Sequence, residues 1–155
     1  MKNNPYNLGI KEYLKDSLQN YYIRILNENG FKLTGSNIAE MFGVYSFKSN
    51  WLNFNIANDR GIIETRISSI LSPDNFYDFD IINVYFNRKN KLKEEKLKFG
   101  KSDLLKRLNL EQESELFERN ISEIKEMFNE SNYRKTELEL NKIANERADI
   151  LFGPK

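Results

Sequence analysis

The chain of 155 residues is long enough for one domain with a sizeable hydrophobic core. Its 24 basic and 23 acidic side chains leave a net charge of +1, which gives no overall attraction to nucleic acid or to an anionic membrane. The chain contains neither cysteine nor histidine, which excludes disulfides, thiolate catalysis, Ser-His-Asp triads and the usual structural zinc sites.

Hydrophobic residues make up 39% and aromatic residues 13% of the chain, which is too apolar for a disordered protein. The N-terminal segment lacks the apolar stretch of a signal peptide, and no run approaches the ~20 apolar residues that span a bilayer. We therefore expect a cytoplasmic protein that does not contact membranes.

The first expected element is a helix that opens at Pro5 and Asn7 and continues to about Asn29. Apolar side chains recur along it at spacings of three and four, as on the buried face of a helix. They are Ile10, Tyr13, Leu14, Leu18, Tyr21, Tyr22, Ile25 and Leu26. Gly30 stands where a left-handed residue commonly ends a helix.

Strand patterns follow this helix. Residues 31–33 predict a short strand and residues 35–37 (Gly-Ser-Asn) a turn, whereas residues 38–42 fit either a strand or a helical turn. Tyr45 and Phe47 predict a further strand, which turns into the next one at residues 49–50.

The clearest pattern in the chain is an antiparallel hairpin. Residues 52–57 and 63–68 alternate between apolar and polar side chains, as in strands that face a core on one side and water on the other. Asn58-Asp59-Arg60-Gly61 connects them. Its Asn, Asp and Gly residues tolerate the left-handed backbone of a tight turn.

After the hairpin, residues 72–75 (Ser-Pro-Asp-Asn) are expected to begin a helix, with Ser or Asp as its cap and Pro near its first position. The buried face of this helix is expected to carry Phe76, Phe79, Ile82 and Phe86.

Residues 88–101 show no hydrophobic periodicity and carry seven Lys or Arg against two Glu, which is typical of a solvated connection.

The C-terminal half is predicted to be helical. Ser102 caps a short helix with Leu104, Leu105 and Leu108, and a capping box of Asn109 and Gln112 opens the next helix. The outer face of that helix is expected to carry Glu111, Glu113, Glu115, Glu118, Glu123 and Glu126. A break at residues 131–133 precedes a last helix, about Lys135 to Phe152, expected to bury Leu140, Ile143, Ala144 and Leu151.

These patterns predict a single α+β domain over residues 1–155. An antiparallel sheet of three to five strands, from about Phe31 to Leu71, packs against the N-terminal helix and the helix that follows the sheet. Residues 1–90 form this helix–sheet–helix core, and residues 102–152 form a helical C-terminal part.

The residues that remain for catalysis are carboxylates. Asp74, Asp78 and Asp80 form a dense cluster that suits either a Mg²⁺ or Ca²⁺ site or the cap of a helix. Capping is the simpler interpretation, because Asp in a first helical turn interacts favourably with the helix dipole. The chain also has no glycine-rich nucleotide-binding motif and no GxSxG. We therefore predict no catalytic residue, no metal site and no cofactor.

Three side chains are candidates for contact with a partner protein. Trp51 is of a type that dominates interface energetics, although it also packs well at a sheet edge. Asp59 and Arg60 either brace the hairpin, by pairing with Asp78 at the helix start, or face a partner. The basic segment 88–101 is a weaker candidate for phosphate contacts.

Three short stretches resemble the pattern of small bacterial immunity-type proteins: Trp51-Leu52-Asn53-Phe54, Asp59-Arg60-Gly61 and Phe76-Tyr77-Asp78-Phe79, the last before an apolar helix. The similarity covers about residues 40–86. Proteins of this type neutralise a cognate toxin by binding it, so the resemblance implies a non-catalytic protein binder. It carries over no partner-contacting residue, because such contacts differ between families.

The sequence therefore favours a non-catalytic cytoplasmic domain that binds a cognate protein, such as a toxin domain. Two alternatives come from other functional classes. One is a nucleic-acid-associated module that uses residues 88–101. The other is a carboxylate- or metal-dependent enzyme that uses Asp74, Asp78 or Asp80.

Overall fold

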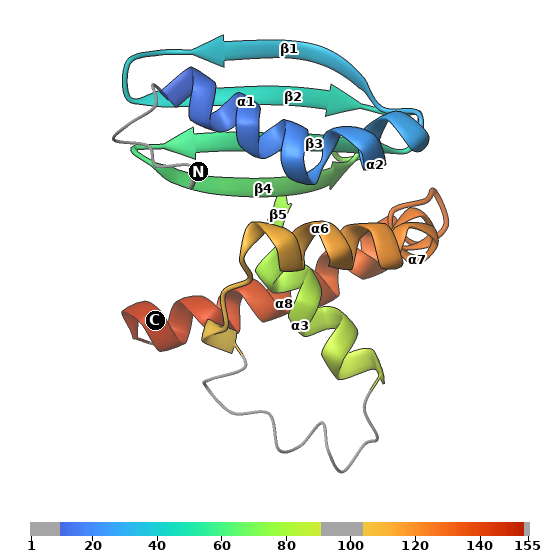
Figure 1. Cartoon of the computed structure of the whole chain (residues 1–155). Helices are drawn as coiled ribbons and strands as arrows, with labels where there is room; N and C mark the ends of the chain where they lie inside the picture. The colour runs from blue at the N-terminus through green and yellow to red at the C-terminus, as the bar shows by residue number, and fades with distance from the viewer. Residues whose placement is uncertain (1–9, 91–103, 154–155) are drawn as a thin grey trace.

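A five-stranded antiparallel sheet is the centre of the structure, a computed structural model that describes residues 10–90 and 104–153 (Figure 1). The strands lie in the sheet in chain order, and every neighbouring pair is antiparallel, which confirms the predicted α+β class and sheet. They are β1 (Lys32–Ile38), β2 (Phe42–Lys48), β3 (Leu52–Asp59), β4 (Ile62–Ser69) and β5 (Tyr77–Asp78).

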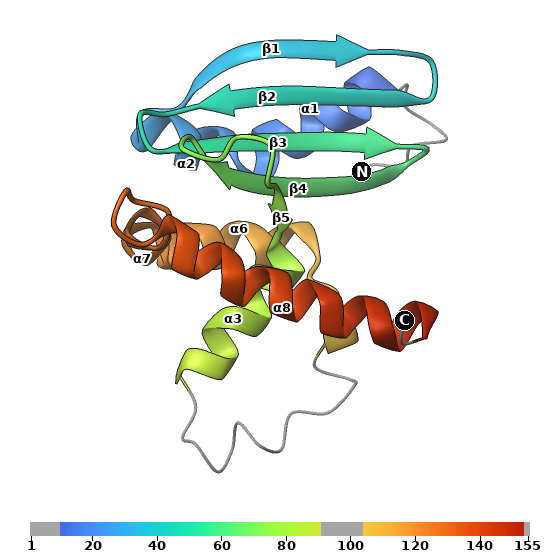
Figure 2. The same ribbon diagram turned by 180° about the vertical axis from the view of Figure 1, so that it is seen from behind.

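Helices flank the sheet on one face and at one edge. In Figures 1 and 2, the two N-terminal helices lie over one face, whereas α3, α6 and α8 lie beyond the β4 edge. Within the described residues, no helix covers the other face of β1–β4 (Figure 2), and none is long and apolar enough to cross a lipid bilayer. The helices are α1 (Ile10–Tyr21), α2 (Ile23–Glu28), α3 (Phe79–Asn90), α6 (Leu110–Arg119), α7 (Ile121–Met127) and α8 (Tyr133–Phe152).

One cluster of buried side chains connects the sheet to both sets of helices. The ring centroid of Phe54 in β3 lies 5.0 Å from that of Tyr22 and 5.7 Å from that of Phe117 in α6. Phe117 in turn lies 5.4 Å from Phe79, the first residue of α3. An aromatic pair adds roughly 0.5–1.5 kcal/mol beyond its area burial, so ring contacts hold helices from both halves of the chain against the sheet.

The central hairpin has the predicted form. β3 pairs with β4 along its whole length, and the apolar positions of β3 are fully buried. Arg60 (φ 54°) and Gly61 (φ 94°) form a two-residue turn in left-handed backbone. The Gly61 N–H donates to Asn58 Oδ1 at 2.7 Å, which closes the turn from within.

The first predicted helix is divided in two at Tyr22, whose backbone (φ −124°, ψ −30°) departs from helical geometry. Gly30 (φ 77°) ends α2 as predicted, and the Phe31 N–H donates to the Leu26 carbonyl at 3.0 Å. The predicted start of the helix at residues 5–7 lies outside the described residues.

β1 is longer than predicted, and its turn comes later. Residues 35–37, predicted as a turn, pair with β2 instead. All seven residues of β1 are exposed, so small polar side chains are compatible with a strand at this edge. The turn lies at residues 39–41, where the Ala39 N–H donates to the Phe42 carbonyl at 2.7 Å.

The helix after the hairpin also begins later than predicted. Residues 72–75 form a turn, and residues 77–78 pair with β4 as β5, which keeps this stretch extended. Asp78 then caps α3 through Oδ1, which accepts from the Ile81 N–H at 2.9 Å. Asp74 and Asp78 therefore do not share a helix.

In the C-terminal half, the capping box is confirmed and two burial predictions are wrong. The Gln112 N–H donates to Asn109 Oδ1 at 2.8 Å, and the Asn109 N–H donates to Gln112 Oε1 at 3.0 Å. Glu113, predicted on the outer face, is buried because it lies one turn before Phe117 on the same side of α6. Leu151, predicted to be buried, is 55% exposed because the end of α8 extends past its neighbours (Figure 1).

The helix that follows the capping box is divided at Asn120 into α6 and α7, whereas the boundaries of the last helix are close to their predicted places. α8 begins at Tyr133 and ends at Phe152; its predicted core residues Leu140 and Ile143 are buried, and Ala144 is half-buried. Leu104 and Leu105 are helical and Leu108 is not. Ser102 and residues 91–101 lie outside the described residues.

Replacing Gly61 with valine tests the hairpin turn. A β-branched residue at φ 94° is strained, so Gly61→Val should lower the free energy of unfolding by about 1–2 kcal/mol in urea denaturation. Gly35→Val is the matched control: Gly35 lies in a strand with open space around its missing side chain, so this change should cost little or nothing. Equal effects of the two substitutions would contradict the turn assignment.

Candidate functional site

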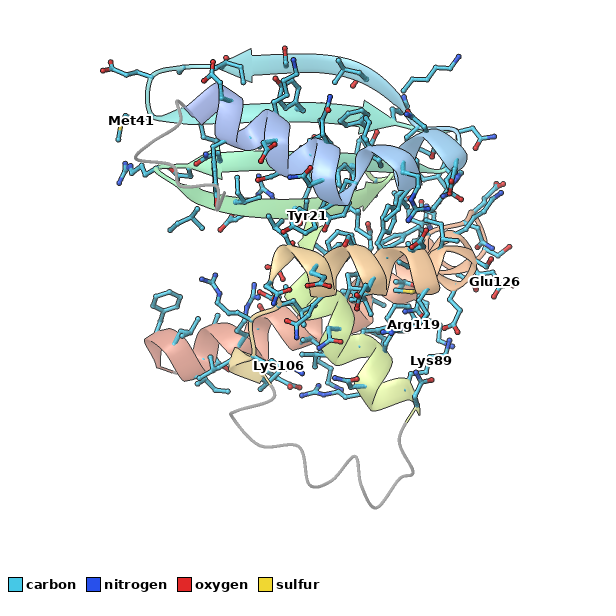
Figure 3. All side chains as sticks on the ribbon, in the orientation of Figure 1. Tyr21, Met41, Lys89, Lys106, Arg119 and Glu126 are labelled. Carbon is cyan, nitrogen blue, oxygen red and sulfur yellow. The ribbon has the colours of Figure 1, made fainter. Side chains whose placement is uncertain are left out.

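Exposed apolar side chains gather at the end of the sheet where both long hairpins turn. Met41 and Phe42, at the β1–β2 turn, are 58% and 39% exposed, and Ile62, after the β3–β4 turn, is 58% exposed. Asp59 and Arg60 lie among them, and Met41 marks this end of the sheet in Figure 3. These five residues are called the tip surface below.

Strand pairing fixes the arrangement of the tip surface. Phe42 lies opposite Asp59 in the β2–β3 pair, and Asp59 lies opposite Ile62 in the β3–β4 pair. Cross-strand neighbours have Cβ atoms about 5 Å apart on one face, so Asp59 stands between two exposed apolar side chains. The Arg60 N–H donates to the Met41 carbonyl at 3.0 Å and thereby joins the two turns.

The two charges of the tip surface contribute little to the fold. Arg60 Nε lies 3.7 Å from Asp59 Oδ1, and both side chains are exposed. Such surface pairs are worth little in stability. The hypothesis that either residue pairs with Asp78 is wrong, because Arg147 of α8 binds both oxygens of Asp78, at 3.2 and 2.9 Å.

Trp51 lies at the opposite end of β3 from the tip surface. Its ring packs edge-on 5.5 Å from that of Phe31, and Lys125 Nζ lies 5.9 Å from its centroid. The eight residues of β3 span roughly 23 Å at ~3.3 Å per residue. The structure therefore does not bring Trp51 together with Asp59 and Arg60.

The aspartate cluster takes part in the fold. Asp78 caps α3, and Asp80 Oδ1 accepts from the Leu108 N–H at 2.8 Å. Burial raises the pKa of Asp80, and the Leu108 hydrogen bond and the Arg107 charge oppose the shift. Asp74 is exposed in the turn before β5. Among the described residues, no three carboxylates are placed to hold a metal ion.

Asp78 and Asp80 also line a cavity of about 580 Å³ between the loop before α6 and the last turns of α8. Its lining combines charged side chains with leucines and Phe152. Arg147 and Arg107 offset the two aspartates inside it.

Glu113 is a buried carboxyl that joins α6 to the sheet. Its Oε2 accepts from the Thr65 hydroxyl at 2.8 Å and from the Tyr22 hydroxyl at 3.4 Å. Burial raises the pKa of Glu113 to about 8, the two hydroxyl donors oppose the shift, and the charges of Asp80 and Asp78 add to it. The carboxyl is therefore mostly protonated at pH 7, which lowers the cost of burying it.

The described part of the basic segment is paired with carboxylates. Arg88 Nη2 lies 2.6 Å from Glu146 Oε2, and Lys89 Nζ lies 3.7 Å from Glu123 Oε2. These two side chains are thus engaged with neighbouring helices, which does not favour their use as phosphate ligands.

Sequence reasoning missed the apolar members of the tip surface. Ile62 occupies a position that the alternation of β4 assigns to a polar residue, and Phe42 does so in β2. A break in the alternation is thus the signal that could have identified them. Their adjacency depends on sheet order, which no local pattern shows.

Truncation of the two tip charges tests whether they support the fold. Asp59→Ala and Arg60→Ala should each change the free energy of unfolding by no more than about 0.5 kcal/mol, because both side chains are exposed. Arg60→Gly should raise stability slightly, because glycine adopts φ 54° without strain. A clear loss of stability in either alanine variant, measured in urea, would contradict this assignment.

The stability of the protein should fall as pH rises through the titration of Glu113. The pKa of Glu113 in the folded protein, about 8, lies above its ordinary value of 4.5. The contribution of Glu113 to the free energy of unfolding is therefore complete below pH 4.5 and is lost as the pH rises to 8 and above. The loss is at most roughly 5 kcal/mol. Glu113→Gln should flatten this dependence in urea denaturation between acidic and alkaline pH. The exposed neighbour Glu111→Gln should leave it as in the wild type, and an unchanged slope in Glu113→Gln would refute the assignment.

Comparison of the chain with known proteins returned no match to a family model, to a curated protein or to a solved structure.

Proposed function

We propose that this chain is a non-catalytic domain that binds another protein through the tip surface. The observation that supports the proposal is the gathering of three exposed apolar side chains around an Asp–Arg pair. Aromatic residues, Met and Arg are the types enriched in protein interfaces, and a few of them usually supply most of the binding energy.

The backbone beneath the tip surface is well suited to recognition. Both turns are closed by hydrogen bonds and flanked by paired strands, and the Arg60 N–H bond to Met41 joins them. A surface held in this way loses little backbone freedom on binding, so more of the contact energy is available as affinity.

The partner class that we propose is a toxin domain, with this chain as its cytoplasmic immunity protein. The support is the resemblance over residues 40–86, which includes the Asp59-Arg60-Gly61 turn of the tip surface. An inhibitor that occludes its target needs apolar contact area and charges that select the target, and the tip surface offers both.

The test uses the protein encoded beside the gene for this chain as the candidate toxin. Co-expression with this chain should restore growth of cells that make the neighbour, and calorimetry should detect a direct complex. The double variant Met41→Asp/Ile62→Asp should weaken binding by roughly 2–4 kcal/mol, because it places unpaired charges in a desolvated contact.

The matched control is Leu138→Asp, which introduces the same charge at an exposed leucine of α8 away from the tip surface. It should protect cells as well as the wild type does. The proposal fails if the neighbouring protein is neither toxic nor bound, or if the double variant binds as tightly as the control while both remain folded.

A further inference from the structure

The outer edge of β1 has no strand paired to it in the described part of the chain. β1 is the first strand of the sheet and pairs only with β2. All seven of its residues are exposed. A free edge of this kind presents a row of backbone N–H and C=O groups to which an extended segment can add as a further strand.

An apolar groove runs beside this edge, between the first two strands and the first two helices. Leu18 and Ile23 line it from the helices, and Leu33, Tyr45 and Phe47 line it from the strands, around a volume of about 390 Å³. Leu33 pairs with Phe47 and is 56% exposed, so it stands at the open side of the groove.

The described residues that line the groove carry a net positive charge. Lys15 and Lys32 are among them, and no described carboxylate is. Neither lysine forms an ion pair with a described residue. Charge complementarity across an interface therefore favours an acidic residue in whatever occupies this groove.

An irregularity in β1 limits which strands can add to it. The register with β2 shifts between Leu33 and Gly35, and the Thr34 hydroxyl donates to the Ser46 carbonyl at 3.1 Å. Bulges of this kind discourage indiscriminate edge pairing. Regular pairing is left to residues 35–38, while Leu33 and the groove beside it remain open to side chains.

We propose that β1 binds an extended segment of a partner protein by strand addition. The segment carries apolar residues at every second position, because alternate side chains of an added strand point to the groove face. It also carries at least one Asp or Glu that faces Lys15 or Lys32. This site includes no residue of the tip surface and goes beyond the function proposed above.

A library of short random peptides displayed on phage, selected against the full chain, tests the proposal. Enriched peptides should share alternating apolar residues and an acidic residue. A synthetic copy of one should shift the backbone amide NMR signals of residues 32–38. Leu33→Asp and Lys15→Glu should each weaken its binding by at least about tenfold.

Leu138→Asp and Lys142→Glu, at exposed positions of α8, are the matched controls and should leave peptide binding unchanged. The tip variant Met41→Asp/Ile62→Asp should also retain it, which separates this site from the proposed function. The proposal would be overturned if no peptide were enriched, or if the apolar residues of the enriched peptides recurred at the spacing of three or four that is typical of a helix. It would also be overturned if the Leu33→Asp variant bound the peptide as tightly as the wild type does. A dimer lost in Leu33→Asp, seen by sedimentation, would also overturn it by assigning the edge to a second copy.

Discussion

The packing of Phe117 is the contact on which the two halves of the molecule depend. The ring of Phe117, carried by α6, lies 6.5 Å from that of Tyr22 between α1 and α2, and 6.1 Å from that of Phe31 just before β1. It lies 5.7 Å from the ring of Phe54 in β3 and 5.4 Å from that of Phe79 in α3. Phe117 is fully buried, and removal of such a side chain typically costs about 3–5 kcal/mol. This one side chain thus packs α6 against residues from the sheet, the N-terminal region and α3. Glu113 lies one helical turn before Phe117 and accepts hydrogen bonds from the Thr65 and Tyr22 hydroxyls. These bonds fix the rotation of α6 about its own axis.

This junction determines which surfaces remain free. The C-terminal helices lie beyond β4, and α1 and α2 lie over one face, so the β1 edge and the turns at one end of the sheet have no described element packed on them (Figures 1 and 2). The tip surface and the β1 groove are therefore consequences of how the core closes. The exposed side chains of both, such as Ile62 and Leu33, lie outside the buried core. Surface residues of this kind are open to selection for binding.

The parts of the fold that the sequence predicted are those governed by local periodicity and capping. Alternation placed β3 and β4 correctly, Gly30 and Gly61 marked left-handed positions, and Asn109 with Gln112 marked the start of α6. The errors arose where distant contacts decide. Residues 35–37 are part of a strand because they pair with β2 at the sheet edge. Helix α3 begins later than predicted because residues 77–78 pair with β4. Asp78 is bound by Arg147 and not by Arg60. The same holds for the candidate site. The turn sequence identified Asp59 and Arg60. The three apolar residues of the tip surface, Met41, Phe42 and Ile62, could be grouped only once the strand order was known.

Native-state hydrogen exchange tests most directly whether the sheet and the C-terminal helices unfold as one unit through the Phe117 junction. Amides in β3 and in α6 should exchange with the same free energy of opening, equal to that of global unfolding, and Phe117→Ala should lower both values together. If α6 and α8 exchanged at a clearly lower free energy than β3, and Phe117→Ala lowered only theirs, the helices would be a separately unfolding attachment and the account of a shared core would be contradicted.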